Sequence, residues 1–562
     1  MCTEQRKPVL AMYDVRGIQD YVFRTAKVRD AIGASAIIED IISDALKYAV
    51  EVIKKKAGHL KCDIEWEGKE GEKRPAEFSM TDEKGEPYDI QVLYIGGGNA
   101  FVIYRECSLC ISVNRIMARY VLEKTYSLQL AVAVVSCDGD YSEDYRNVFN
   151  EMNAVKAKMN ISRPLGTLPV MEMELKTGYP ISPKDSISAD GKAASEESIL
   201  KKKAESEKRK DLDQILKKFS TYETQKGTDS TIAVVHLDGN NMGLRIRSLI
   251  ETETDYTTAV NKMRNISYNI NHSYKEVFED MEKKFNAGEE NFILKILTAG
   301  DDITYVANGK AAIASVEYFS REIAKRYMYR AEEDEEENIR KYGFSVCAGI
   351  AFLHSHFPFY VAYDIAENCC GSAKKKAKRE ENIYNGKIGN WFDFHFCQNS
   401  DARDLKNTRK REYMTATGEN LLIRPYELPL PDFPERKEAH DRYENLKSAI
   451  EFFRRGASSD DSSKPEISGE KRDYLLRSHS KMLRNTYSLG RPRVERFLSF
   501  LRSRNWTMPD GSMDAYIHGA GSGPDIAKWY DALELMDDYE PLQTFLTQAE
   551  KKADTEKEEE RK

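Results

Sequence analysis

Three aspartates follow or interrupt strand-like runs in a way that could hold two divalent cations. Asp238 ends one apolar run, and Asp301 with Asp302 lies at the tip of a predicted hairpin between two more. Phosphoryl transfer from a triphosphate uses two such cations, one at the attacking hydroxyl and one at the leaving pyrophosphate. Hard cations prefer carboxylates, and neighbouring strands lie about 4.8 Å apart. The pattern therefore predicts a catalytic site in which these aspartates share two Mg²⁺ or Mn²⁺ ions.

Two glycines support this prediction. Gly300 lets the hairpin turn tightly, and Gly239 would allow its main-chain carbonyl to become a further metal ligand. Gly and Asp also dominate ordinary hairpin turns, so the paired aspartates alone would suit a plain polar turn equally well. The matching Asp238 at a neighbouring strand end favours the metal site.

A basic run at residues 374–379 ends a predicted helix. Cations are expected at a helix C-terminus from the helix dipole alone, so a solvated helix end is one interpretation. A metal-bound triphosphate, however, still needs cations on its outer oxygens. We predict that Lys374 makes this contact, followed by Lys378. Further nucleotide contacts are predicted at Asn241, Ala299 and Gly300.

These residues belong to one half of an internal repeat. Residues 8–160 and 230–380 carry the same order of strand, helix, helix, hairpin, helix and strand, which is the ferredoxin-like arrangement of palm domains. In register, Gly98 and Asn99 stand where the second unit has its paired aspartates. The first palm should therefore bind no catalytic metal. Its tip, including Gly97, is predicted to hold a second nucleotide as the acceptor.

The predicted fold class is α+β, with two ferredoxin-like palm domains and a helical C-terminal domain. Residues 196–218 have almost no apolar face and predict a solvated linker helix or a partly disordered segment. The expected divisions are a first palm at 1–162, a charged linker at 163–228, a second palm at 229–425, a helical domain at 426–550 and a disordered charged tail at 551–562.

Composition narrows the functional classes. The chain has 562 residues, of which 41% are hydrophobic, and no apolar run approaches the roughly 18 residues of a membrane span. A net charge of -8 argues against general adhesion to nucleic acid. Nine scattered cysteines indicate reduced core thiols, so we expect a cytoplasmic protein without membrane contact.

Several motifs resemble those of the large subunit of type III CRISPR effector complexes, the CRISPR polymerase family with GGDEF-like palm domains. Residues 237–243 resemble its Asp-Gly-Asp-Asn-Met-Gly motif, and residues 299–302 resemble Gly-Gly-Asp-Asp. Further likeness lies at 17–23, 32–35, 96–99, 348–351 and 424–426. The resemblance implies synthesis of cyclic oligoadenylates from ATP in antiviral defence. RNA and other effector subunits are its implied partners, and a homo-oligomer is also compatible with it.

The chain also departs from the family pattern. Asn240 replaces an expected acid and Ala299 replaces the first glycine of the second motif. The HD nuclease domain of many relatives is not recognisable. The zinc module is not recognisable either, because Cys107 and Cys110 form a single Cys-x-x-Cys motif without a second one. We therefore expect a reduced or stand-alone homologue. Two alternatives remain open: a catalytically weak scaffold that binds nucleotide, RNA or protein, and a metal nuclease, for which no histidine partner is evident.

Overall fold

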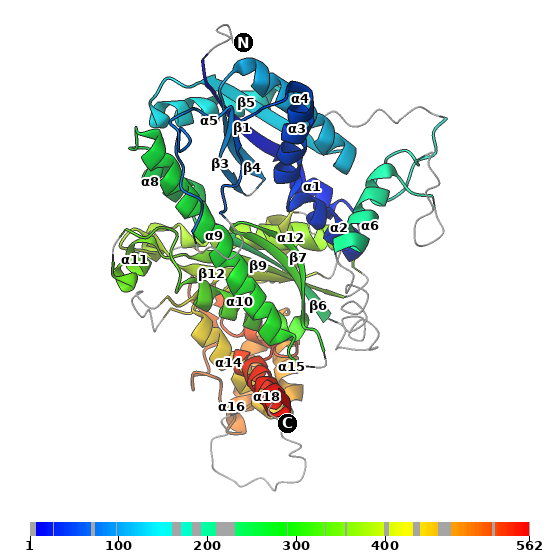
Figure 1. The fold of residues 1–562 in the computed structure, drawn as a ribbon. Coiled ribbons are helices and arrows are strands. Elements are labelled where there is room, and N and C mark those ends of the chain that lie inside the picture. Colours follow the sequence, from blue (N-terminus) through cyan, green and yellow to red (C-terminus); the bar gives the residue numbers. More distant parts are fainter. Residues whose placement is uncertain are drawn as a thin grey trace.

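The computed structural model describes residues 7–560 except 26, 69–73, 97, 160–169, 183–192, 209–230, 289, 332, 355–356, 398–403, 431–438, 459–473 and 520–522. Two mixed sheets lie one above the other, and helices of the C-terminal region lie at the end of the molecule opposite the N-terminus (Figure 1). Within the described ranges, no helix combines the length and hydropathy needed to cross a bilayer. The predicted α+β class is confirmed.

The first palm is built on a five-stranded sheet of order β2-β3-β4-β1-β5. Its central strand β1 runs antiparallel to both β4 and β5. The elements of this part are β1 Val9–Arg16, α1 Ile18–Phe23, α2 Val28–Ile38, α3 Ile41–Ala57, β2 Cys62–Asp63, β3 Ile90–Gly96, β4 Asn99–Tyr104, α4 Cys107–Thr125, β5 Gln129–Ser136, α5 Tyr141–Lys158 and α6 Glu196–Lys208.

The second palm repeats this core and extends it. Its sheet has the order β13-β12-β9-β6-β8-β7, in which β6 runs antiparallel to β8 and β9 as β1 does to β4 and β5. Its elements are β6 Thr231–Gly239, α8 Met242–Ile250, α9 Tyr256–Phe285, β7 Ile293–Ala299, β8 Asp302–Asn308, α10 Gly309–Ile323, α11 Glu335–Tyr342, β9 Val346–His354, α12 Phe359–Ala377, a 3-10 turn Glu380–Asn382, β10 Ile383–Tyr384, β11 Lys387–Ile388, β12 Asn390–Phe396, α13 Leu405–Glu412 and β13 Tyr426–Leu428.

The hairpins β3–β4 and β7–β8 are equivalent in detail. Each first strand carries a register shift, between Val92 and Tyr94 in one and between Lys295 and Leu297 in the other. A bulge bends a strand and increases its twist, so both hairpin tips are aimed in the same way relative to their sheets. The repeat read from the sequence therefore holds at the level of strand register.

The helix α9 joins the two palms. It packs against β7 and α10 of its own domain and against β3 of the first palm. Arg264, which has no exposed area, donates from Nε to Leu93 O at 2.8 Å, from Nη1 to Ala76 O at 2.8 Å and from Nη2 to Val92 O. A fully buried guanidinium is tolerated only when its donors are satisfied. Arg264 therefore fixes α9 to the first palm.

The C-terminal helices cover the far side of the second palm. They comprise α14 Tyr443–Ser458, α15 Arg477–Tyr487, α16 Arg491–Ser503, α17 Tyr530–Leu535 and α18 Leu542–Glu560, with a small ladder of β14 Tyr516–Ile517 and β15 Ile526–Ala527. Buried Arg424 donates from Nη2 to Glu534 at 2.8 Å, and Asp531 accepts from Tyr426 at 2.9 Å. These contacts attach α17 beside β13.

Two segments differ from expectation. The described part of the predicted solvated helix is α6, which packs on α2 with Glu197 and Lys201 fully buried, and residues 209–218 of that prediction lie outside the described residues. Lys201 Nζ donates to Glu197 at 2.7 Å and to Tyr21 O at 2.7 Å, so charges that suggested a solvated face neutralise each other inside. The tail expected from residue 551 is helical as far as Glu560.

Candidate functional site

The structure brings the three aspartates together at one end of the second sheet. Asp238 is the last residue but one of β6, and β6 pairs with β8 up to Leu237 opposite Ile303. Asp302 begins β8 opposite Ala299, with Gly300 and Asp301 between them in the turn. A central strand end and the tip of the adjacent hairpin thus meet.

Glycine at 239 is required by the approach of a carboxylate. A Cβ atom on Gly239 would lie 2.7 Å from Asp301 Oδ2 and 2.9 Å from the hydroxyl oxygen of Tyr274. Both separations are shorter than side chains tolerate, so another residue would displace one of these groups. Gly300 has φ of +66°, a left-handed conformation that glycine adopts without strain. These two small residues let the backbone close around the carboxylates.

Negative charge exceeds positive charge here. Burial, and then the charge of Asp238, raises the pKa of both Asp301 and Asp302 to about 7. The Nζ atom of Lys374 forms an ion pair with Asp238. Burial acts to lower the pKa of Lys374, but Asp238 outweighs it and the pKa is raised. One lysine therefore faces three carboxylates.

The donor set fits a divalent cation. Asp302 Oδ1 is buried without a hydrogen-bond partner among the described residues, and His236 Nδ1 lies 3.4 Å from it. Burial lowers the pKa of His236, so a neutral ring faces that oxygen. Within the described chain no three His, Cys, Asp or Glu side chains lie in positions that could together hold a metal ion, so Asp238, Asp301 and Asp302 would have to move closer to bind one. The Lys374 ammonium now stands against Asp238, where a cation would bind.

The remaining predicted residues of the second palm lie at the ends of three neighbouring elements. Asn241 caps α8 in a left-handed conformation with φ of 54°, and Ala299 ends β7. Lys378 lies exposed at the C-terminal cap of α12. Asn240 is buried, and its amide donates to Ser345 Oγ at 3.1 Å and to Gly389 O at 3.0 Å. The residue that replaces the expected acid thus binds the neighbouring strand region.

The first palm has an equivalent arrangement of strand end, hairpin tip and lysine, but with fewer carboxylates. Asp14 lies near the end of β1 as Asp238 lies near the end of β6, and it forms an ion pair with Lys156 of α5 as Asp238 does with Lys374. Its β4 partner is Asn99, and Gly98 O accepts from the next residue of β1 at 3.1 Å. Gly97 lies outside the described residues. The repeat in the sequence is the signal that could have identified the Asp14–Lys156 pair.

Sequence reasoning missed a polar face of α9. Ser267, Asn271 and Tyr274 follow the i, i+4, i+7 spacing of one helix face. A Cβ on Gly96 would lie 3.2 Å from Ser267 Oγ and 3.3 Å from Asn271 Nδ2, and one on Gly300 would lie 3.5 Å from Asn271 Oδ1. This face therefore lies against both hairpin tips. Polar residues at helical spacing inside an otherwise apolar stripe were the available signal.

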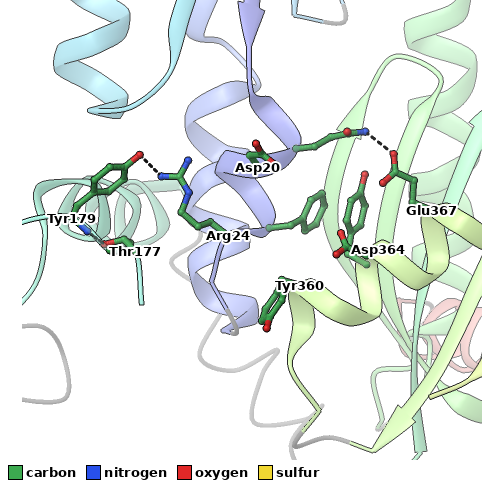
Figure 2. A pocket seen from close by; sticks show the side chains of 11 residues that line it. Asp20, Arg24, Thr177, Tyr179, Tyr360, Asp364 and Glu367 are labelled. Carbon is green, nitrogen blue, oxygen red and sulfur yellow. Dashed lines mark hydrogen bonds between the residues drawn. The ribbon is translucent and has the colours of Figure 1, made fainter. Parts of the chain in front are cut away.

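A cavity of about 490 Å³ opens beside the cluster, between α1, α12 and residues 177–179. Figure 2 shows Arg24 bonded to Tyr179 on one side and Glu367 accepting from Gln19 on the other. The charge of Glu367 also contributes to the raised pKa of Asp302. The first palm therefore contacts, through α1, a fourth carboxylate near the site.

Comparisons with known proteins agree with the sequence motifs. Residues 231–383 match the family described as Cas10/Cmr2, second palm domain. No curated protein matches the chain at a significant level. Similar solved structures include a Csm1-Csm4 cassette in complex with pppApApA (13% identity, 98% of this chain and 70% of that one, TM-score 0.48) and Csm1 in T.onnurineus (12%, 97% and 70%, 0.47).

A third, a Csm1-Csm4 cassette in complex with cA4, aligns over 69% of this chain and only 57% of its own, at 15% identity and a TM-score of 0.38. These structural overlaps are loose, and the assignment rests on the matched domain. That domain contains the three aspartates and Lys374. Over residues 231–383 the chain therefore matches the second palm domain of the Cas10/Cmr2 family.

Proposed function

We propose that the second palm is a metal-dependent nucleotidyl cyclase that joins ATP into a cyclic oligoadenylate within type III CRISPR defence. The observation that carries this proposal is the convergence of three carboxylates, only one of them paired with a lysine, at the end of β6 and the β7–β8 tip. The motif resemblance favours ATP as the substrate.

Asp238, Asp301 and Asp302 would hold two Mg²⁺ or Mn²⁺ ions, which when bound activate the attacking hydroxyl and neutralise the triphosphate. The other steps belong to the chain itself. Lys374 can move from Asp238 to the outer phosphate oxygens, because a metal-bound Asp238 no longer needs the ammonium. Gly239 leaves room for the Asp301 carboxylate. The neutral ring of His236 supports Asp302 without adding charge.

The first palm would present the acceptor nucleotide. Gly98 and Asn99 form the tip equivalent to the catalytic one but supply no carboxylate, so a nucleotide bound there is held without metals. Asp14 is neutralised by Lys156 in the same arrangement. The two palms would act as a pseudo-dimer with one donor site and one acceptor site. RNA and another effector subunit would supply the activating signal.

The test is incubation of the full chain with each nucleoside triphosphate and Mg²⁺ or Mn²⁺, followed by mass analysis of the products. The Asp301→Ala, Asp302→Ala double variant should lose all product and remain folded. Glu380→Ala with Glu381→Ala, two adjacent exposed carboxylates, is the matched control. Product at the parental rate from the first variant would refute the proposal.

A second candidate function is nucleotide binding without catalysis. It is favoured by Asn240, which stands where an acid is expected and whose amide instead donates to Ser345 and Gly389. A palm pair that binds nucleotide without turnover would act as a scaffold in an effector complex. Nucleotide binding by the parental chain without product, also in the presence of RNA and an effector subunit, would favour this function.

A further inference from the structure

The hydroxyl group of Tyr274 lies beside the catalytic aspartates without a partner. Tyr274 has no exposed area, and its hydroxyl makes no hydrogen bond within the described chain. Most buried polar side-chain atoms in proteins are hydrogen-bonded, so an unpaired one calls for an explanation. This hydroxyl and Asp301 Oδ2 lie within 2.9 Å and 2.7 Å of the position that a Cβ of Gly239 would occupy. The phenol therefore points at the site.

The charges around this hydroxyl define its role. Burial, and then the charge of Asp301, raises the pKa of Tyr274 well above its usual value, so the phenol keeps its proton. Arg245, the cation that faces it, is bound to Gly343 O at 2.9 Å and is itself a donor. The phenol proton therefore has the carboxylate as its natural acceptor. A carboxylate that binds a cation through one oxygen is oriented by a donor on the other.

The helix that carries Tyr274 is fixed at both palms. Arg264 attaches α9 to three carbonyl groups of the first palm, and Asn271 lies one turn before Tyr274 between Gly96 and Gly300. A donor on such a helix has a defined place relative to the β7–β8 tip.

We propose that Tyr274 is a positioning residue whose hydroxyl donates to Asp301 and fixes that carboxylate for cation binding. The inference rests on the proposed function, because it assigns a role within the same site. It extends the site from the strand ends to α9, and through Arg264 it makes the orientation of a catalytic carboxylate depend on the docking of the first palm.

The experiment compares the full chain with Tyr274→Phe and Tyr305→Phe. Tyr305 is the matched control: it is also fully buried in the second palm, but its hydroxyl bonds to Ser315 at 2.8 Å. Mn²⁺ binding without nucleotide is measured by electron paramagnetic resonance, with Asp301→Asn to identify the site. We expect Tyr274→Phe to weaken Mn²⁺ binding about 10-fold, the lower end of the range of roughly 10- to 100-fold that is typical of a group that orients a metal ligand. Tyr305→Phe should leave it unchanged.

Turnover gives the second readout. Tyr274→Phe should lower kcat while the KM for the nucleotide changes less than twofold, and thermal melting should show that the variant is folded. Parental Mn²⁺ affinity and kcat in Tyr274→Phe would overturn the inference, as would Mn²⁺ binding that does not depend on Asp301. If the parental chain binds Mn²⁺ through Asp301 but makes no product, the proposed function fails and the Mn²⁺ comparison alone decides the role of Tyr274.

Discussion

Removing one charge from the carboxylate cluster should stabilise the metal-free protein at alkaline pH. The change is Asp302→Asn. The pKa of Asp302 is raised from 3.8 to about 7, because burial and the charges of Asp238 and Glu367 oppose ionisation more than Lys374 favours it. The folded state therefore binds this proton more tightly than the unfolded state does. Below about pH 4 both states are protonated and nothing is lost, whereas stability falls as pH rises towards 7.

The size of the effect follows from the shift and the exposure. Raising the pKa of Asp302 from 3.8 to about 7 corresponds to about 4 kcal/mol at most. The Asp302 side chain is 30% exposed, so solvent screens part of this interaction. We expect about 1–2 kcal/mol, which for a domain of about 150–250 residues raises the melting temperature by about 2–8 °C.

Thermal unfolding of the full chain in EDTA at pH 5 and pH 8 measures this effect. Asp302→Asn should melt above the parental chain at pH 8 and by a smaller margin at pH 5, because the destabilisation of the parental chain grows between about pH 4 and pH 7. Excess Mg²⁺ should stabilise the parental chain more than the variant, since ligand binding stabilises the form that binds it. Glu381→Gln, an exposed carboxylate, is the control. A variant that melts at or below the parental temperature at pH 8 in EDTA would refute the electrostatic reasoning.

Three further changes test other parts of the molecule. Lys374→Ala should raise the KM for the nucleotide roughly 10- to 100-fold, the equivalent of a charge-assisted contact of about 1.5–3 kcal/mol, while Lys375→Ala on the exposed side should not. Arg264→Met should lower the free energy of unfolding by about 3 kcal/mol, because three carbonyl groups lose their donor, and an unchanged urea midpoint would contradict the docking role. Asn99→Ala should shorten the product distribution without changing Mn²⁺ affinity; an unaltered distribution would remove the acceptor role from the first palm.

Much of this architecture could be read from the sequence because its signals are local. Apolar runs ending in Asp14 and Asp238, with glycine-rich tips at equivalent positions, predicted two sheets with the same central order. The side-chain period of a strand fixes which residues share a face, so register followed once the repeat was aligned. The presence of paired aspartates in one tip and Gly98 with Asn99 in the other was likewise a property of the sequence alone.

The tertiary structure decided which distant residues neutralise one another. The sequence of the charged segment at 196–208 did not indicate that Glu197 and Lys201 would form a buried ion pair. The role of α9 was equally hidden, because Arg264 and Tyr274 act on groups far away in the chain. Propensity and periodicity report which side of an element is buried but not what it is buried against. The sequence therefore predicted the carboxylates and Lys374 as members of one site, whereas the ion pair between Lys374 and Asp238 and the contact of α9 with the hairpin tips became visible only once the chain was folded.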